Sequence, residues 1–279
     1  MNQPMLPTVE VGDQTITRLI VGGNPFRGNS HLNPDLDRDM REYHTNENVV
    51  KTLFRAEECG INTMQSRGDD IVFDMVRAYR DAGGTMQWIV QTASERPDLF
   101  ENIREIATLD PIAIYWHGSM TDRMWKEDRI HELEEYLKAI RDTGKLVGVA
   151  CHMPHVLRWI EDQNWDVDFY MTCFYNLAKI KRESMLVTGK FVEEPFDDQD
   201  REPAIEFINF TSKPCIAYKI LAASRKCGTE AELRGAFQYA YDNIKPGDLV
   251  NVGVFQKHAD QIGQNARIVR EILNVAIEA

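Results

Sequence analysis

The chain has 279 residues, of which 43% are hydrophobic and 27% are charged, so it contains enough apolar material for a substantial core. This composition excludes disordered and collagen-like proteins. Lys and Arg total 32 against 44 Asp and Glu, which gives a net charge of −12. Because the neutralisation of phosphates needs a positive surface, nucleic acid is not expected as a partner.

The sequence also limits where the protein works. It has no run of about 18 apolar residues, and residues 1–7 lack a charged start followed by an apolar core. We therefore expect a cytoplasmic protein with no membrane partner. The five cysteines are widely spaced and form no CxxC pair, which suits free thiols better than disulfides or a structural zinc site. Cys151, Cys173 and Cys215 lie in apolar runs and are expected to be buried.

The first predicted element is a hairpin over residues 8–18, which alternates around Gly12 and Asp13 and is expected to close one end of the fold. After it, short apolar runs alternate with longer amphipathic stretches, as in a parallel sheet with crossover helices. The apolar runs predict strands at 19–23, 62–65, 86–91, 112–117, 147–152, 169–173, 215–219 and 249–254. The amphipathic stretches predict helices near 46–59, 69–82, 97–108, 123–143, 154–163, 199–211, 229–243 and 258–277.

These repeating units run through the chain without a composition break or a flexible linker. They predict one domain over residues 1–279, a (β/α)8 TIM barrel with an N-terminal β-hairpin cap, with a doubly wound sheet as the alternative. One long irregular connection, residues 176–198, follows the sixth strand. Its place after the carboxyl end of a strand predicts a binding loop on the catalytic face.

Polar side chains follow most of the predicted strands, where the sites of such barrels lie. They are imidazoles, amides, a phenol and a guanidinium, which suit a polyhydroxylated or carboxylated small molecule better than an apolar one. The predicted substrate-binding residues are Asn24, His31, Gln65, Arg67, Gln91, Tyr175 and Asn176. For Arg67, a salt bridge to the nearby Asp69 or Asp70 is the alternative reading.

Three residues are candidates for catalysis. His117 and His152 end neighbouring predicted strands, so their rings are expected to converge on one substrate atom or one metal ion. The alternative is that each ring only caps its strand. Lys219 ends the apolar run CIAYK, which makes it a candidate base or nucleophile, or a simple anion-binding group.

A metal ion would need further ligands beside His117 and His152, and His31 and Glu95 are the candidates, with no diagnostic spacing among them. Asp69 and Asp70 are further candidates for the same role. Alternation along the fourth strand predicts that Trp116 faces the helices if His117 faces the barrel axis. The remaining histidines, His44, His131, His155 and His258, are expected at the surface.

Several motifs, in order, resemble the aldo-keto reductase superfamily: LIVGGNPF after the hairpin, AEECGINTMQSRG, LKAIRDTGKLVGVACH, FYNLAK and VNVGVFQKHADQIGQNARIV. The resemblance implies a capped barrel and a catalytic Asp, Tyr, Lys and His. Laid onto this sequence, the Asp position falls on Asn62, the Tyr position on Arg67 and the Lys position near Ala93, and only His117 is retained. Because Arg does not release its proton at neutral pH, the resemblance implies that carbonyl reduction is disabled.

The same resemblance implies that a nicotinamide cofactor, if used, contacts Lys257 and Asn265, beside Gln261 and Gln264. Three functions therefore remain open. The favoured one is a lyase, isomerase or hydrolase that uses His-based or metal-assisted chemistry on a sugar-like or hydroxy-acid molecule. The others are an NAD(P)H-dependent oxidoreductase and a non-catalytic binding barrel. The sequence leaves the cofactor open between a divalent metal ion and NADP, and it is compatible with a homo-oligomer.

Overall fold

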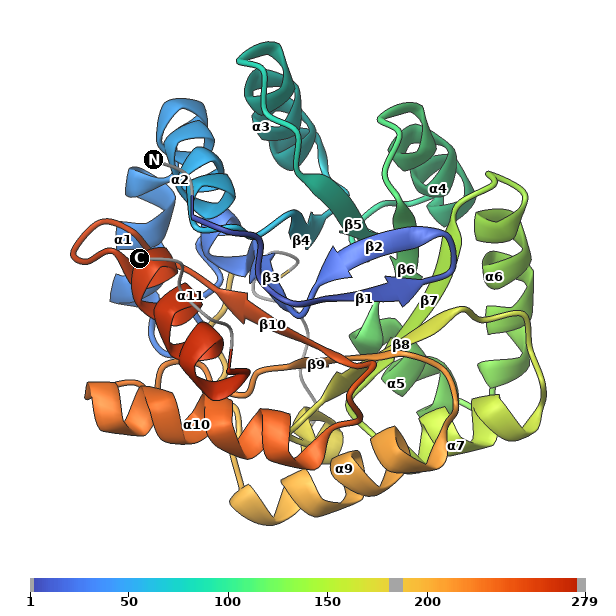
Figure 1. Ribbon diagram of the computed structural model, residues 1–279. Helices are drawn as coiled ribbons and strands as arrows, with labels where there is room; N and C mark the ends of the chain where they lie inside the picture. Colours follow the sequence, from blue (N-terminus) through green and yellow to red (C-terminus); the bar gives the residue numbers. More distant parts are fainter. Residues whose placement is uncertain (1–2, 181–187, 275–279) are drawn as a thin grey trace.

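The computed structural model describes residues 3–180 and 188–274, and it confirms the predicted (β/α)8 barrel. Eight parallel strands close in chain order, with the last beside the first (Figure 1). They are β3 (Leu19–Gly22), β4 (Thr63–Arg67), β5 (Gln87–Gln91), β6 (Ala113–Trp116), β7 (Leu146–Cys151), β8 (Phe169–Cys173), β9 (Cys215–Tyr218) and β10 (Leu249–Gly253). The apolar runs therefore predicted the strands closely, and the doubly wound alternative is excluded.

Helices surround the barrel (Figure 1). Those described are α1 (Pro34–Tyr43), α2 (Asn46–Glu58), α3 (Asp70–Asp81), α4 (Leu99–Thr108), α5 (Gly118–Lys126), α6 (Leu133–Arg141), α7 (Pro154–Asp162), α9 (Arg201–Phe210), α10 (Glu230–Asn243) and α11 (Gln261–Ile272). The prediction of one helix over 123–143 is wrong. Asp128, with a positive φ of 56°, ends α5, and a 3-10 turn, η2 (Ile130–Glu132), leads into α6.

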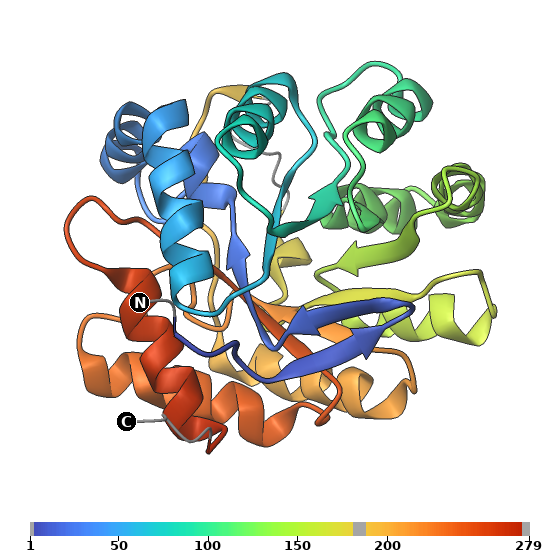
Figure 2. The same cartoon turned by 45° about the horizontal axis from the view of Figure 1, so that its top comes forward.

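The predicted hairpin is confirmed as β1 (Thr8–Val11) and β2 (Gln14–Thr17), joined at Gly12, whose φ is +61°. Val11 and Ile16 are buried in one cluster with side chains of the barrel interior. The side chains of Asn62 and Gln87, which lie where β4 and β5 begin, donate hydrogen bonds to the Thr15 carbonyl. The hairpin therefore covers the N-terminal end of the barrel, as Figure 2 shows, and leaves the opposite end for the site.

Side chains alternate between the two faces of the barrel wall. The interior cluster includes Ile20, Ile89, Ala113, Phe169, Met171, Ile216 and Leu249. Facing outward, Trp116 stacks on Tyr136 of α6 with 4.3 Å between ring centroids, while His117 lines the cavity described below, which confirms the predicted alternation. Gly148 belongs to the interior, because a Cβ there would lie 2.3 Å from the Phe169 ring.

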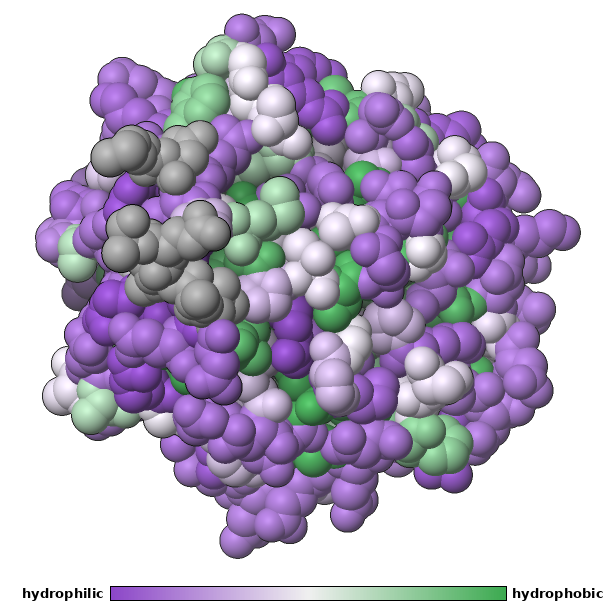
Figure 3. Space-filling model, in the orientation of Figure 1, coloured by the Kyte–Doolittle hydropathy of each residue, from purple (hydrophilic) through white to green (hydrophobic). Residues whose placement is uncertain are grey.

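Hydrophilic side chains cover most of the face seen in Figure 3, with hydrophobic ones scattered among them. Among the described residues, no helix has both the length and the apolar composition needed to cross a lipid bilayer. The prediction that His44 lies at the surface is wrong. Its ring is 3% exposed and lies among Phe26, Tyr43 and Phe255.

Candidate functional site

The most ordered polar contact at the C-terminal end of the barrel joins His152, directly after β7, to Asp122 of α5. Asp122 Oδ2 lies 2.6 Å from His152 Nδ1, and Oδ1 accepts from the His152 backbone N–H at 3.0 Å and from Cys151 Sγ at 3.1 Å. Both side chains are buried. Burial opposes the charged form of Asp122, but the charge and hydrogen bonds of His152 hold the pKa of this carboxyl below its usual value.

The local sequence explains how α5 comes so close to β7. Helix α5 begins at Gly118, immediately after His117, and packs against β7. A Cβ on Gly118 would lie 3.3 Å from His152 Cε1, so the glycine allows the close approach. A carboxylate at Nδ1 keeps the ring proton there, which makes Nε2 the basic nitrogen of the ring. The arrangement therefore orients His152 for proton transfer through Nε2.

A second group of contacts surrounds Arg67, the last residue of β4, which is 6% exposed. Its guanidinium forms an ion pair with Glu95, lies 3.6 Å from Asp69 Oδ2 and donates to Ser94 Oγ at 3.2 Å. Burial lowers the pKa of Arg67 to about 10, with Asp69 acting in the opposite direction, so the group is cationic at neutral pH. Both readings of Arg67 therefore hold, because it forms salt bridges and also lines the cavity.

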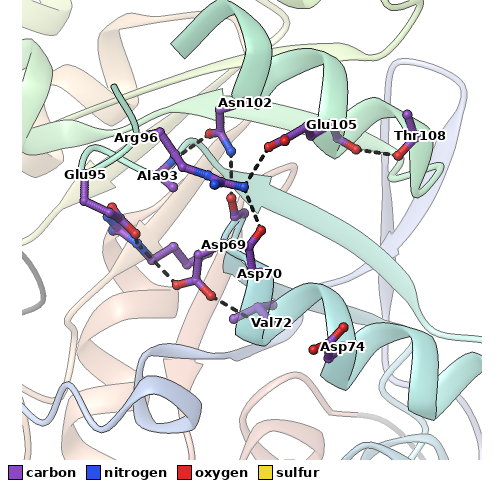
Figure 4. Close-up of polar contacts among 12 residues, drawn as sticks. Asp69, Asp70, Val72, Asp74, Ala93, Glu95, Arg96, Asn102, Glu105 and Thr108 are labelled. Carbon is purple, nitrogen blue, oxygen red and sulfur yellow. Dashed lines mark hydrogen bonds and ion pairs between the residues drawn. The ribbon is translucent and has the colours of Figure 1, made fainter. Parts of the chain in front are cut away.

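Figure 4 shows how this side of the site is held. Asp69 caps α3 by accepting from the Val72 N–H at 3.0 Å. Next to it, Asn102 accepts from the Ala93 N–H and donates to the Gly68 carbonyl, which ties α4 to the ends of β4 and β5. Arg96 joins Asp70 to Glu105. Asp70 therefore serves this outer network and not the cavity.

A third cluster spans the mouth between the loop after β3 and the end of β9. Glu194, a buried residue of the loop after β8, has Oε2 at 3.0 Å from His31 Nδ1 and at 3.8 Å from Lys219 Nζ. His31 and Lys219 both have positive φ, +57° and +60°. Such strained backbone conformations occur preferentially where a side chain has to be aimed at a site.

Deeper in the barrel, amides and a phenol form a chain. Asn251 Nδ2 donates to Gln65 Oε1 at 2.9 Å, and Gln65 Nε2 donates to the Tyr115 hydroxyl at 2.7 Å. Burial raises the pKa of Tyr115 above its usual value, so the phenol is neutral at physiological pH.

These groups border two adjoining cavities. The first, of about 80 Å³, is lined by residues that include His31, Arg67, Gln91, His117, His152 and Lys219. The second, of about 400 Å³, extends past β9 and β10 and is lined by residues that include Gln65, Tyr115, Tyr218, Ser224, Asn251, Gln264 and Asn265. Both are also bordered by Asn24, His31, Gln91, Tyr218 and Lys219, so a ligand is able to reach from one into the other.

The structure thus gathers most of the predicted site residues around these two cavities, with Gln65 beside the second. Two predicted substrate-binding residues are not among them. Tyr175 is fully buried with its hydroxyl 3.3 Å from Asp198 Oδ1, and Asn176 caps the turn η3 (Leu177–Lys179), so the prediction is wrong for both. Part of the predicted binding loop, Lys190 to Glu194, does line the first cavity, while residues 181–187 lie outside the described residues.

The cofactor predictions have mixed outcomes. Asn265 lines the second cavity, whereas Lys257 forms an ion pair with Asp39 and does not border it. Of the predicted metal ligands, His31, His117 and His152 share the first cavity, but Glu95 is paired with Arg67. Within residues 3–180 and 188–274, no three His, Cys, Asp or Glu side chains are grouped to hold a metal ion.

The structure also corrects the placement of the reductase tetrad. Asn62 precedes β4, at the hairpin end of the barrel, where its Oδ1 accepts from the Thr17 N–H. It therefore cannot occupy a catalytic position at the opposite end. Ala93 is fully buried behind the site, whereas Arg67 and His117 do lie at the mouth.

Asp122 and Glu194 were missed by sequence reasoning. Neither lies at the end of a strand, and each pairs with a histidine far away in the chain. For Asp122 a signal existed, because a helix that follows one strand of a barrel packs against the next strand, and α5 begins at the mouth.

Searches of family models and of curated proteins return no match. Solved structures match at low identity. Gox0644 in its apo form has a TM-score of 0.59 at 10% identity, over 96% of this chain and 93% of that one. A dihydropteroate synthase from Xanthomonas albilineans, in complex with indole-2-carboxylic acid and 6-chloroguanine, has a TM-score of 0.56 at 10% identity, over 98% and 99%.

An uncharacterised Bacillus cereus protein has a TM-score of 0.51 at 10% identity, and the match covers 95% of this chain and 65% of that one. The chain is a TIM barrel. At such low identity these likenesses establish the fold alone, and they do not establish membership of the aldo-keto reductase superfamily.

Proposed function

We propose that the protein is an enzyme that moves protons on a small hydroxy acid or sugar-like acid, with His152 as general base. The Asp122–His152 contact carries this proposal, because it fixes the ring tautomer beside a cavity that also contains cationic groups. The reaction class is isomerisation or elimination, both of which begin with removal of a proton next to a carboxylate. No metal ion is assigned a role, because the described donors do not group.

The surroundings support an anionic substrate. Arg67 and Lys219 bring positive charge to the first cavity, and Asn24 and Gln91 offer amide donors and acceptors for hydroxyl groups. Two cations beside the base also stabilise the enediolate that forms when the proton leaves. This polar mouth disfavours a non-catalytic binding barrel, for which an emptier and more apolar mouth is expected.

The order of motifs and the hairpin cap further support an origin in the aldo-keto reductase superfamily. In that reading the barrel was kept, and the position of the proton-donating phenol is occupied by Arg67. Because Arg67 is a cation engaged by Glu95 and Asp69, it offers no proton to a carbonyl. The proposal is therefore that hydride transfer has been replaced by proton transfer.

The test is exchange of the α-proton in D2O, followed by NMR on a panel of lactate, glycerate, malate, tartrate and gluconate. We expect the protein to exchange at least one compound and His152→Asn to slow that exchange at least about 100-fold. The matched control, His155→Asn, changes an exposed ring of α7 and is expected to leave the rate unchanged. Failure to exchange any compound refutes the proposal.

The volume of the second cavity supports a second candidate, an NAD(P)H-dependent oxidoreductase. Its 400 Å³ lie along β9, β10 and α11, and Tyr218 offers a ring for stacking. The phosphate partners are few, however. Lys219 is the one Lys or Arg among its described lining residues, and the N-terminus of α11 is already capped by Asp260, which pairs with Arg55. Quenching of tryptophan fluorescence by NADH or NADPH at micromolar concentration would favour this candidate.

A further inference from the structure

The first cavity contains a second imidazole that is oriented by a carboxylate. His31 Nδ1 lies 3.0 Å from Glu194 Oε2, and its Nε2 lies 3.3 Å from Asn24 Nδ2. The side chains of His31 and Glu194 are 15% and 6% exposed, so little water screens their attraction. A carboxylate at Nδ1 stabilises the imidazolium and leaves proton transfer to Nε2, as Asp122 does for His152.

The two imidazoles approach the cavity from opposite sides of the barrel. His31 lies in the loop after β3, and His152 directly follows β7. In the closed order of eight strands, β3 and β7 are four strands apart in either direction, which places them across the barrel from each other. Both side chains line the same cavity of about 80 Å³. A small molecule held there therefore has one imidazole on each side.

The cations lie where they can hold such a molecule by its carboxylate. Arg67 ends β4, and Lys219 follows β9, so both come from strands other than those that carry the two imidazoles. Lys219 Nζ lies 3.8 Å from Glu194 Oε2, so Glu194 is shared between a cation and the ring of His31. A carboxylate bound by Arg67 and Lys219 leaves its α-carbon between the two rings.

We propose that the protein inverts the configuration at this carbon by a two-base mechanism, a claim that rests on the proposed function. His152 Nε2 takes the α-proton, and the electron pair of the broken C–H bond passes into an enediolate, whose charge Arg67 and Lys219 offset. The imidazolium of His31 then gives its Nε2 proton to the opposite face of the carbon. Substrate and product are isomers, no oxidant is consumed, and the rings recover their protons from water.

The reverse reaction uses the same groups in exchanged roles, so each ring acts on one stereoisomer. The experiment takes the D and L forms of lactate, glycerate, malate and tartrate separately in D2O. The wild-type protein is expected to convert each form of its substrate into the other, with deuterium in the product. His31→Asn and His152→Asn are each expected to slow interconversion at least about 100-fold.

The two variants differ in what they retain. His31→Asn keeps α-proton exchange of the form whose proton faces His152, and His152→Asn keeps exchange of the other form. Exchange by the wild-type protein without any interconversion overturns the two-base mechanism and leaves the proposed function standing. Interconversion by His31→Asn at the wild-type rate does the same. Absence of all exchange refutes both proposals.

Glu194 acts here as a positioning residue, and its role has a readout of its own. Glu194→Gln removes the charge that stabilises the His31 imidazolium, so the pH above which His31 stops donating is expected to fall. Glu194→Asp is expected to restore the wild-type pH profile in part. The control is Glu193→Gln, a change to the exposed neighbouring carboxylate, which should leave the profile unchanged. An unchanged profile in Glu194→Gln would contradict the assignment of His31 as proton donor.

Discussion

Replacement of Asp122 by Asn tests how His152 is oriented. Asp122 accepts from the His152 N–H through Oδ1 and contacts the ring Nδ1 through Oδ2. Asn keeps the shape and the first contact, but its amide NH2 takes the place of Oδ2 and donates to Nδ1. The ring proton then moves to Nε2, and the base is lost where the substrate binds. We expect proton exchange to fall by about 10³- to 10⁴-fold.

That loss corresponds to about 4–5.5 kcal/mol in activation free energy, at about 1.4 kcal/mol for each factor of ten. The assay is α-proton exchange in D2O together with ¹⁵N NMR of the His152 ring, which reports the tautomer. Asp166→Asn is the matched control, because this carboxylate is 72% exposed and pairs with Arg141 at the surface. If Asp122→Asn exchanges at the wild-type rate while its ring carries the proton on Nε2, the reasoning is refuted.

Three further predictions concern stability and cofactors. Burial lowers the pKa of His44 from 6.5 to about 4, so the neutral ring stabilises the fold above pH 6.5, and this contribution, at most about 3 kcal/mol, is lost as the pH falls towards 4. In chemical denaturation, His44→Phe should weaken this pH dependence, and an unchanged slope would contradict it. Gly148→Ala should lower the free energy of unfolding by about 1–3 kcal/mol, because its Cβ overlaps Phe169, whereas Gly235→Ala, in open space on α10, should stabilise the helix. Treatment with EDTA should leave α-proton exchange unchanged, and a loss restored by a divalent metal would instead support metal-assisted chemistry.

The fold could be predicted in detail because strands covered on both faces must be apolar throughout. The eight runs were therefore legible without knowledge of their partners, and the Gly12 turn marked the hairpin. Helix α1 was missed because its sequence, PDLDRDMREY, is mostly charged and buries little more than Asp37 and Met40. The break between α5 and α6 was missed because a single residue, Asp128, turns the chain there.

The candidate site could be predicted only where strand ends carry it. His117, His152 and Lys219 follow β6, β7 and β9, and topology alone brings them to one cavity. Asp122 and Glu194 reach the site from a helix and a loop, so their pairing depends on tertiary packing that no local pattern encodes. These two carboxylates turn a set of polar side chains into two oriented imidazoles.

The most direct test of the central claim compares α-proton exchange by cofactor-free protein with the same reaction after addition of NADH or NADPH. The account predicts that deuterium enters the substrate carbon without any nicotinamide and that His152→Asn abolishes this incorporation. A protein that labels nothing on its own, yet oxidises added NADPH in the presence of a carbonyl compound, would show that hydride transfer was retained.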